Sequence, residues 1–413
     1  MADSRPSREE QKQRLKRNVI DTEEELGKDE EKRLSPFVIL IFLLIIAVIG
    51  FGAYYYLNNS LSESYTVLWE RRPQEMQGTV ETFKGYESFA DGIIKYTKDG
   101  AEYVDKDGNV IWERSYQLNS PIISLSETHA VIADQGGTNI YIFSEDMLTG
   151  TSETILPISL VRVSDNGIVY AVLNDSEAEY ITAFREDGSA IDLSVKSIVT
   201  GDGYPFDIAV SPDGSELLTS YAGIDNGQII NNVVFRNFSA VGQNEDARRI
   251  VGGFSDEFAG HLAGRVHFST NDSSQAFYDG GVVFFSTKVL NSPEILEHVT
   301  FEQKIDMIAA SKDIVAVMLE EDGTDGVYST LMIYSNRGAK LGEVSLDYRY
   351  TDMCITGTSV AVSDSVNIFV YNKRGTMRAS LQYSEGELSS MIGTKRNGEL
   401  FTISGNDLFR IRY

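Results

Sequence analysis

Two hydrophobic patterns divide the chain. Residues 37–57 form one continuous apolar run without a charged side chain. From residue 65 to residue 413 the apolar residues come instead in short alternating runs, separated by glycines that often follow Asp or Asn. A long continuous run predicts a helix, whereas alternation with a period of two predicts β-strands. The sequence therefore predicts one apolar helix followed by an all-β domain.

The apolar helix is long enough for a membrane span. Residues 37–57 would extend about 30 Å as an α-helix, which matches the hydrocarbon core of a bilayer. Nine Lys and Arg residues precede the run and the next one after it is Arg71, so the positive-inside rule places the N-terminus in the cytoplasm. The tyrosines at 54–56 suit the outer interface. A cleaved signal peptide is the alternative, but these bulky residues fit a cleavage site poorly.

The residues after the span contain hairpin signals at short intervals. Apolar alternation is clear in Gly92–Tyr96, Asn139–Phe143 and Val282–Phe285. Asp-Gly and Asn-Gly pairs separate such runs, as at residues 213–214 and 397–398. Glycine accepts the positive φ that tight hairpin turns need, so these pairs indicate hairpins in series.

An internal repeat selects a β-propeller among the all-β folds. Residues 66–71 (TVLWER) recur 43 positions later as residues 109–114 (NVIWER). Four strands in a unit of about 43 residues is the size of a propeller blade. Inner strands spaced by this period are predicted to begin near Glu87, Pro121, Ile158, Tyr204, Gly264, Ile305, Tyr350 and Leu388. These starts predict an eight-bladed propeller, although dividing the irregular stretch 204–303 differently predicts a seven-bladed one.

The two ends of the domain predict how the ring closes. The last unit contains only three strands, and residues 66–71 supply its missing outer strand. Such a strand removes the free edge and latches the ring. Four segments result, which are a charged, disordered cytoplasmic tail (1–35), a transmembrane helix (36–57), a linker (58–64) and an extracytoplasmic propeller (65–413). The closing strand starts at the face of the third-to-fourth-strand turns, so that face is expected to look toward the membrane.

The opposite face, which we call the loop face, carries the connections between blades. These connections include residues 72–85, 201–206, 252–265 and 347–351. Propellers usually bind with such loops, because a rigid ring holds several variable loops in register. The candidate partner-binding residues are the aromatic and charged side chains Tyr204, Phe206, Glu257, Phe258, His261, Arg265, Tyr348, Arg349 and Tyr350. The alternative is that these side chains pack between blades.

Charge limits the range of partners. The formal net charge is −25, and nearly all of it lies outside the cytoplasmic tail. Such a field repels nucleic acids and other polyanions at long range. The single cysteine, Cys354, excludes an intramolecular disulfide framework, so the domain must be stabilised by packing.

No motif for catalysis, metal binding or phosphate binding is present. His261 and His267 do not have metal-ligand spacing. Residues 105–109 (DKDGN) begin like a calcium loop, but the position for its distal glutamate is occupied by Tyr116. Glycine-rich phosphate loops and nucleophile elbows are also absent from the sequence. The sequence therefore predicts no catalytic residue, no metal and no cofactor.

The blade pattern resembles a known group of bacterial proteins. A turn followed by Val-Ile-Trp-Glu at residues 110–113, and Ser-Pro-Asp-Gly at 211–214 opening a hairpin, resemble quinoprotein-like and WD-repeat-like propellers. With the single N-terminal anchor, the chain resembles a family of membrane-bound bacterial propellers of unknown function. True quinoprotein dehydrogenases have a tryptophan floor in their cofactor pocket. Trp69 and Trp112 both fall in predicted outer strands, so this resemblance implies the fold without the cofactor.

Two functions remain open from the sequence. The first is a non-enzymatic scaffold at the outer face of a bacterial cell membrane, held in the lipid bilayer by Phe37 to Leu57. It would bind a protein or peptide partner, and no nucleic acid, through the loop face. The second is a hydrolase or lyase that acts on envelope glycans with carboxylates at the channel mouth, since propellers also host glycosidases with paired acids.

Overall fold

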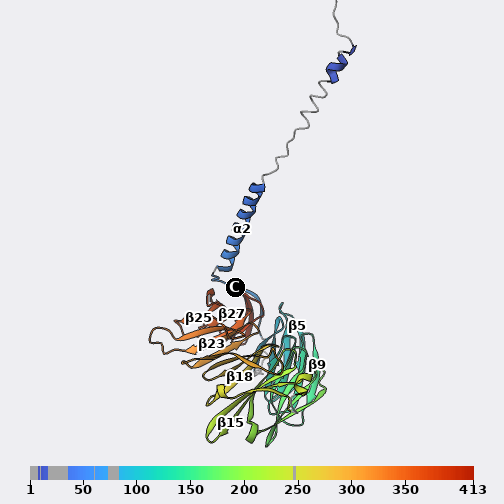
Figure 1. The fold of residues 1–413 in the computed structure, drawn as a ribbon, viewed down its shortest axis with the longest axis vertical. Helices are drawn as coiled ribbons and strands as arrows, with labels where there is room; N and C mark the ends of the chain where they lie inside the picture. The colour runs from blue at the N-terminus through green and yellow to red at the C-terminus, as the bar shows by residue number, and fades with distance from the viewer. Residues whose placement is uncertain (1–7, 10, 17–35, 60, 73–82, 245–247) are drawn as a thin grey trace, which may run out of the picture. The chain divides into compact units, whose positions relative to one another are not determined.

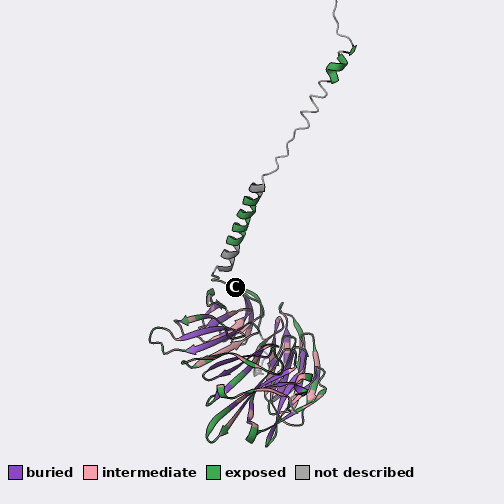
Figure 2. Ribbon diagram, viewed as in Figure 1, coloured by how far each residue is buried: buried purple, intermediate pink, exposed green. Residues whose placement is uncertain are grey.

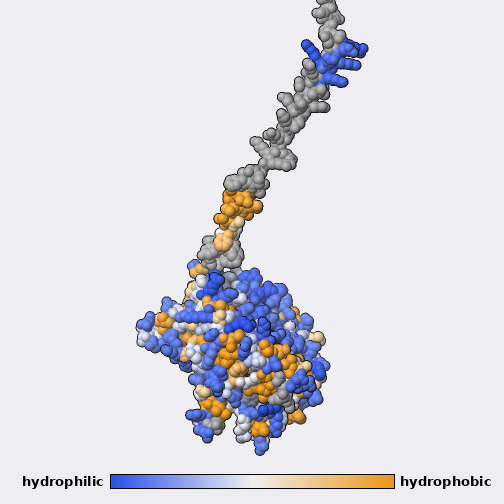
Figure 3. Space-filling view, viewed as in Figure 1, coloured by the Kyte–Doolittle hydropathy of each residue, from blue (hydrophilic) through white to orange (hydrophobic). Residues whose placement is uncertain are grey.

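The computed structural model describes residues 8–9, 11–16, 36–59, 61–72, 83–244 and 248–413. The chain divides into two compact units, Met1–Ser60 and Leu61–Tyr413. In the first unit, α2 (Pro36–Asn59) contains the predicted apolar run, and its large apolar side chains from Leu40 to Phe51 are exposed (Figures 2 and 3). Among the residues described, no helix has the length and apolar character required to cross a membrane. Most of the predicted cytoplasmic tail lies outside the described residues.

The second unit consists of eight four-stranded antiparallel sheets, numbered here as blades 1 to 8 (Figure 1). Blade 1 contains β2 (Phe83–Phe89), β3 (Gly92–Thr97), β4 (Gly100–Val104) and β5 (Val110–Ser115). Blade 2 contains β6 (Pro121–Leu125), β7 (His129–Asp134), β8 (Asn139–Ser144) and β9 (Leu148–Glu153). Blade 3 contains β10 (Ile158–Val163), β11 (Val169–Asn174), β12 (Ala178–Phe184) and β13 (Ala190–Ile198). Blade 4 contains β14 (Tyr204–Val210), β15 (Glu216–Asp225), β16 (Gln228–Asn237) and β17 (Ile250–Phe254).

The remaining blades repeat this order. Blade 5 contains β18 (Ala263–Thr270), β19 (Ser273–Tyr278), β20 (Gly281–Ser286) and β21 (Glu294–Thr300). Blade 6 contains β22 (Ile305–Ala310), β23 (Ile314–Glu320), β24 (Ser329–Ser335) and β25 (Lys340–Leu346). Blade 7 contains β26 (Asp352–Thr356), β27 (Ser359–Ser363), β28 (Asn367–Asn372) and β29 (Met377–Gln382). Short helical segments are α3 (Val199–Asp202), α4 (Ala240–Gln243) and the 3₁₀ turn η1 (Asp256–Phe258).

Blade 8 is built from both ends of the propeller unit. It contains β30 (Ser390–Gly393), β31 (Glu399–Ser404), β32 (Asp407–Arg412) and, as its outer strand, β1 (Thr66–Arg71). The register pairs Thr66 with Arg412 and Arg71 with Leu408. The predicted closing strand is therefore confirmed. The stretch 204–303 holds two complete blades, so the ring has eight blades and the seven-bladed alternative is wrong.

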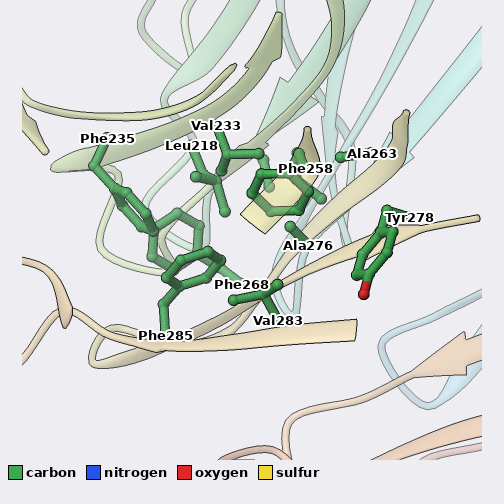
Figure 4. Packing of buried hydrophobic residues seen from close by; sticks show 12 residues of the cluster. Leu218, Val233, Phe235, Phe258, Ala263, Phe268, Ala276, Tyr278, Val283 and Phe285 are labelled. Atoms are coloured by element: carbon green, nitrogen blue, oxygen red, sulfur yellow. The ribbon is translucent and has the colours of Figure 1, made fainter. Parts of the chain in front are cut away.

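The hydrophobic core lies between neighbouring blades. Strands in the middle of the sheets, such as β19 and β20, are buried along their whole length because both of their faces are covered (Figure 2). Figure 4 shows the cluster between blades 4 and 5, where Phe235 of β16 and Phe285 of β20 meet edge to face at 5.2 Å. Interlocked aromatic rings of this kind add to the free energy gained from burial.

Carboxylates link the inner strands of adjacent blades. An inner strand has no further strand on its channel side, so some of its backbone N–H groups lack a ladder partner. Asp207 of blade 4 accepts the N–H of Val266 in blade 5 at 2.9 Å. Asp352 of blade 7 accepts the N–H of Met391 in blade 8 at 2.6 Å. These bonds satisfy buried donors and hold the blades in register.

Candidate functional site

All nine predicted partner-binding residues lie between blades or at the start of an inner strand, on the loop face. They form two groups. The first group surrounds the junction of blades 4 and 5, and the second lies between β25 and β26 at the junction of blades 6 and 7. Of the predicted loop 72–85, residues 73–82 lie outside the residues that the structure describes.

The first group is only partly available to a partner. Phe206 is 44% exposed, and Tyr204 and Glu257 are half-buried. His261 is exposed and its Nδ1 lies 2.8 Å from Oδ1 of Asp279. The prediction for Phe258 is wrong, because this ring is 0% exposed and packs edge to face on Tyr278 at 5.7 Å. A large apolar ring in a short connection is stabilised more by the core than by solvent.

The second group is tied into the ring. The Tyr348 hydroxyl lies 3.2 Å from that of Tyr371, and its ring centroid is 4.5 Å from that of Phe369. The Tyr350 hydroxyl donates to Asp306 of the neighbouring blade. Arg349 is exposed, and its guanidinium lies 4.9 Å from the ring centroid of Tyr328. The alternative interpretation, that these rings pack between blades, describes Tyr348 and Tyr350 better than partner binding does.

Blade 4 contains an exposed apolar feature that the sequence analysis missed. Strands β15 and β16 are both ten residues long, and their ends pair as a hairpin from Ala222–Asn231 to Asp225–Gln228. The turn between them is Asn226-Gly227, with φ values of 50° and 82°, as tight hairpins require. We call the exposed apolar side chains of this hairpin and of the adjoining connection the apolar projection, which comprises Ile198, Val199, Ile224, Ile229 and Ile230.

The apolar projection lies on the loop face. Its hairpin turn joins a second strand to a third, and α3 joins blade 3 to blade 4, so both belong to that face. The hairpin and the end of α3 pack closely. If Gly203, which follows α3, carried a Cβ atom, that atom would lie 3.0 Å from the carbonyl oxygen of Ala222 in β15. Ile224 is 78% exposed. The signal in the sequence was the Asn-Gly pair at residues 226–227, flanked by Ile224, Ile229 and Ile230.

A cavity of about 720 Å³ occupies the central channel. Its wall comes from the inner strands and first turns of blades 1 to 6. Arg265, predicted as part of a surface loop, instead belongs to this wall. The charged and imidazole side chains of the wall are Glu87, Glu127, Arg162, Asp165, Arg265, His267 and Lys312.

Ion pairs cross the channel at the face of the first-to-second-strand turns, which we call the turn face. Glu127 of blade 2 lies 3.6 Å from Nζ of Lys312 in blade 6, on the opposite side of the ring. It also lies 3.7 Å from Nζ of Lys395 in blade 8. These exposed pairs contribute little to stability individually. They nevertheless place three long side chains over this mouth of the channel.

Glu179 and Glu216, two buried carboxyl groups with raised pKa values, do not lie together. Burial raises the pKa of both Glu179 and Glu216 to about 7. Glu179 follows a second-to-third-strand turn of blade 3, whereas Glu216 follows a first-to-second-strand turn of blade 4, so they lie toward opposite faces. Neither belongs to the cavity wall. Across the described ranges, no three His, Cys, Asp or Glu side chains are placed to hold a metal ion.

Glu216 makes the stability of the ring depend on pH. Because its folded-state pKa is raised, its contribution to stability is full below its ordinary pKa and is lost as pH rises toward 7. We expect Glu216→Gln to gain about 3 kcal/mol relative to the unsubstituted chain between about pH 5 and about pH 8. Chemical denaturation at both pH values measures this difference. The exposed control Glu177→Gln should show no such gain, and an equal gain in both variants would contradict the assignment.

Solved structures with a similar fold are propellers. BamB from Moraxella catarrhalis matches with 13% sequence identity and a TM-score of 0.52, over 84% of this chain and 100% of that chain. Chaetomium thermophilum Sqt1, bound to the N-terminus of ribosomal protein L10, matches with 11% identity and a TM-score of 0.53, over 85% and 99%. Apo AztD from Citrobacter koseri matches with 11% identity and a TM-score of 0.50, over 73% and 86%. At these identities the likeness shows the fold alone.

Comparison of sequences identifies the family. The search of curated proteins finds no match. A family model described as a family of unknown function, DUF5711, matches residues 58–412. This match covers the linker and nearly all of the propeller, in agreement with the resemblance to propellers of unknown function. The chain therefore belongs to the DUF5711 family of unknown function.

Proposed function

We propose that this protein is a non-enzymatic scaffold whose propeller binds a protein or peptide partner on the loop face. The apolar projection carries this proposal. Isolated exposed isoleucines are common on protein surfaces, but a contiguous exposed group on a raised hairpin is typical of interaction sites. The hydrolase alternative has no observation in its favour among the described carboxylates.

The edge of β16 suggests how a partner would be held. β17 pairs with β16 only from Val233 onward, so no strand of the sheet covers the outer edge of residues 228–232. An extended partner segment could add to this edge through backbone hydrogen bonds, while Ile229 and Ile230 would contact its side chains. The Sqt1 structure, with its bound L10 N-terminus, is a precedent for a propeller of this architecture that holds a peptide.

The same proposal places the propeller outside a bacterial cell membrane. Its support is the uncharged run 37–57 and the charge asymmetry around it. With the N-terminus in the cytoplasm, the chain would hold the propeller close to the outer surface of the bilayer. The loop face would then look away from the membrane toward envelope partners, because β1 enters the ring from the turn face.

Crosslinking on intact cells tests partner and location together. A membrane-impermeant crosslinker should capture the same partner reproducibly with the unsubstituted chain. Replacing Ile224, Ile229 and Ile230 by serine should reduce this capture at least about tenfold, since each buried isoleucine contributes about 1.5–3 kcal/mol. The recovered adducts are quantified by mass spectrometry.

A matched control removes exposed apolar side chains from the other face. Met147 and Val289, both exposed and both in third-to-fourth-strand turns, are replaced by serine. This variant should capture the partner as the unsubstituted chain does. Equal capture by both variants would overturn the apolar projection as the docking site. Labelling that appears only after the cells are lysed would overturn the location.

A further inference from the structure

Glu87 and Arg265 face the central cavity from opposite sides of the ring. Glu87 is on β2 of blade 1 and Arg265 is on β18 of blade 5, four blades away. Both line the cavity. Burial in the channel raises the pKa of Glu87, and the charge of Arg265 partly offsets this effect. The two side chains thus line the same cavity, yet they form no ion pair with each other.

The other charged groups of the cavity wall already have partners. The Arg162 guanidinium lies 2.5 Å from Oδ1 of Asp207. Lys312 pairs with Glu127, and Asp165 accepts the N–H of Glu127 at 2.8 Å. Within the described part of the chain, the side chains of Glu87 and Arg265 make no hydrogen bond and no ion pair. Among the described charged side chains of the cavity wall, these two therefore remain free to bind a ligand.

His267 adds an uncharged polar group beside them. It follows Arg265 by two residues on β18 and lines the same cavity. Its Nε2 is buried and has no hydrogen-bond partner among the described residues. Burial lowers the pKa of His267 to about 4, so its imidazole is neutral at pH 7. Of these three side chains, only Glu87 and Arg265 then carry a charge. A buried polar atom without a partner costs free energy unless a ligand or water satisfies it.

We propose that the central cavity binds a small zwitterion of the α-amino-acid or short-peptide class. The ligand carboxylate would pair with Arg265 and its ammonium group with Glu87, while His267 would bond a further polar atom. A simple anion would be repelled by Glu87 and a simple cation by Arg265, whereas a zwitterion satisfies both. The cavity of about 720 Å³ lies within the usual range for small-molecule sites.

Calorimetric titration of the full-length chain tests this site. The probes are glycine, serine, glutamine and glycylglycine, and the singly charged controls are acetate and methylammonium. At least one zwitterion should bind, and binding should weaken at least about tenfold in both Arg265→Gln and Glu87→Gln, because each removes a charge-assisted pair. The control Lys304→Gln, which removes a surface pair with Glu320, should bind as the unsubstituted chain does.

Three outcomes of the titration would contradict a zwitterion site in the cavity. Unfolding midpoints of the variants are measured first, so that a loss of binding is compared only between folded proteins. No binding of any zwitterion at millimolar concentration would overturn it. Binding that is unchanged in both cavity variants would place the ligand elsewhere and would overturn it too. Acetate binding as tightly as the zwitterions would also overturn it, because the cavity would then be a simple anion site.

Discussion

A propeller that begins at residue 73 should be less stable by at least about 2 kcal/mol than one that begins at residue 61, because it loses the contacts of the partly buried Trp69. The shorter chain lacks β1, and therefore Trp69. The Trp69 indole N–H donates to the carbonyl oxygen of Lys106 in blade 1 at 2.9 Å. Its ring centroid lies 5.8 Å from that of Phe401 in blade 8. Its loss removes contacts to both blades at the closing junction. Urea denaturation of the two chains measures the difference.

The shorter chain should also associate with itself. Without β1, the edge of β32 presents unpaired backbone groups, which are a template for pairing with another chain. Light scattering should show concentration-dependent association, and a synthetic peptide of residues 61–72 should suppress it and restore stability. Equal stability of the two chains, or no response to the peptide, would show that β1 does not latch the ring.

Glu399→Ala should cost about 3–5 kcal/mol, because it leaves a buried cation without its partner. Arg410 is 1% exposed, and its Nη2 lies 2.6 Å from Oε2 of Glu399. Oε1 of the same carboxylate accepts from Nη2 of Arg412 at 2.7 Å. Arg410 also donates to the carbonyl oxygen of Asp91 at 2.9 Å, so this network joins blade 8 to blade 1. The free energy of unfolding from urea titration gives the cost.

A surface pair and an apolar replacement provide the controls. Glu343→Ala breaks an exposed pair with Lys340 and should cost less than about 1 kcal/mol. Glu399→Leu combined with Arg410→Met should recover most of the stability that Glu399→Ala loses, since well-packed apolar residues often replace a buried ion pair without cost. If Glu399→Ala costs no more than Glu343→Ala, the network does not stabilise the closing junction.

The fold could be predicted from the sequence because its information is local and repeated. Each unit carries its own apolar alternation and its own turns, so blade number and the closing strand followed from the period shared by residues 66–71 and 109–114. The burial of Phe258 could not be predicted in this way. A connection that folds back into the core and one that stays on the surface have the same composition.

The candidate site was harder to predict because it depends on distance across the ring. Glu87 and Arg265 are far apart in the sequence and line the same cavity only because blades 1 and 5 lie opposite each other. Nothing local to either residue indicates which side of an inner strand faces the channel, since the bulges in β2 and β18 shift the alternation. The apolar projection was easier to predict from the sequence, because its Asn-Gly turn and the two strands that flank it are contiguous in the chain.

Blade 8 can form only after the last strand of the propeller, β32, has been synthesised. During synthesis β1 is made before any other strand of the ring, but its partner β32 follows only after more than three hundred further residues. Until then β1 has no sheet to join, and the growing ring keeps an open edge. A chain that stops before β32 can complete seven blades and still display that edge, which proteases and chaperones recognise. Blade 8 thus distinguishes complete propellers from truncated ones.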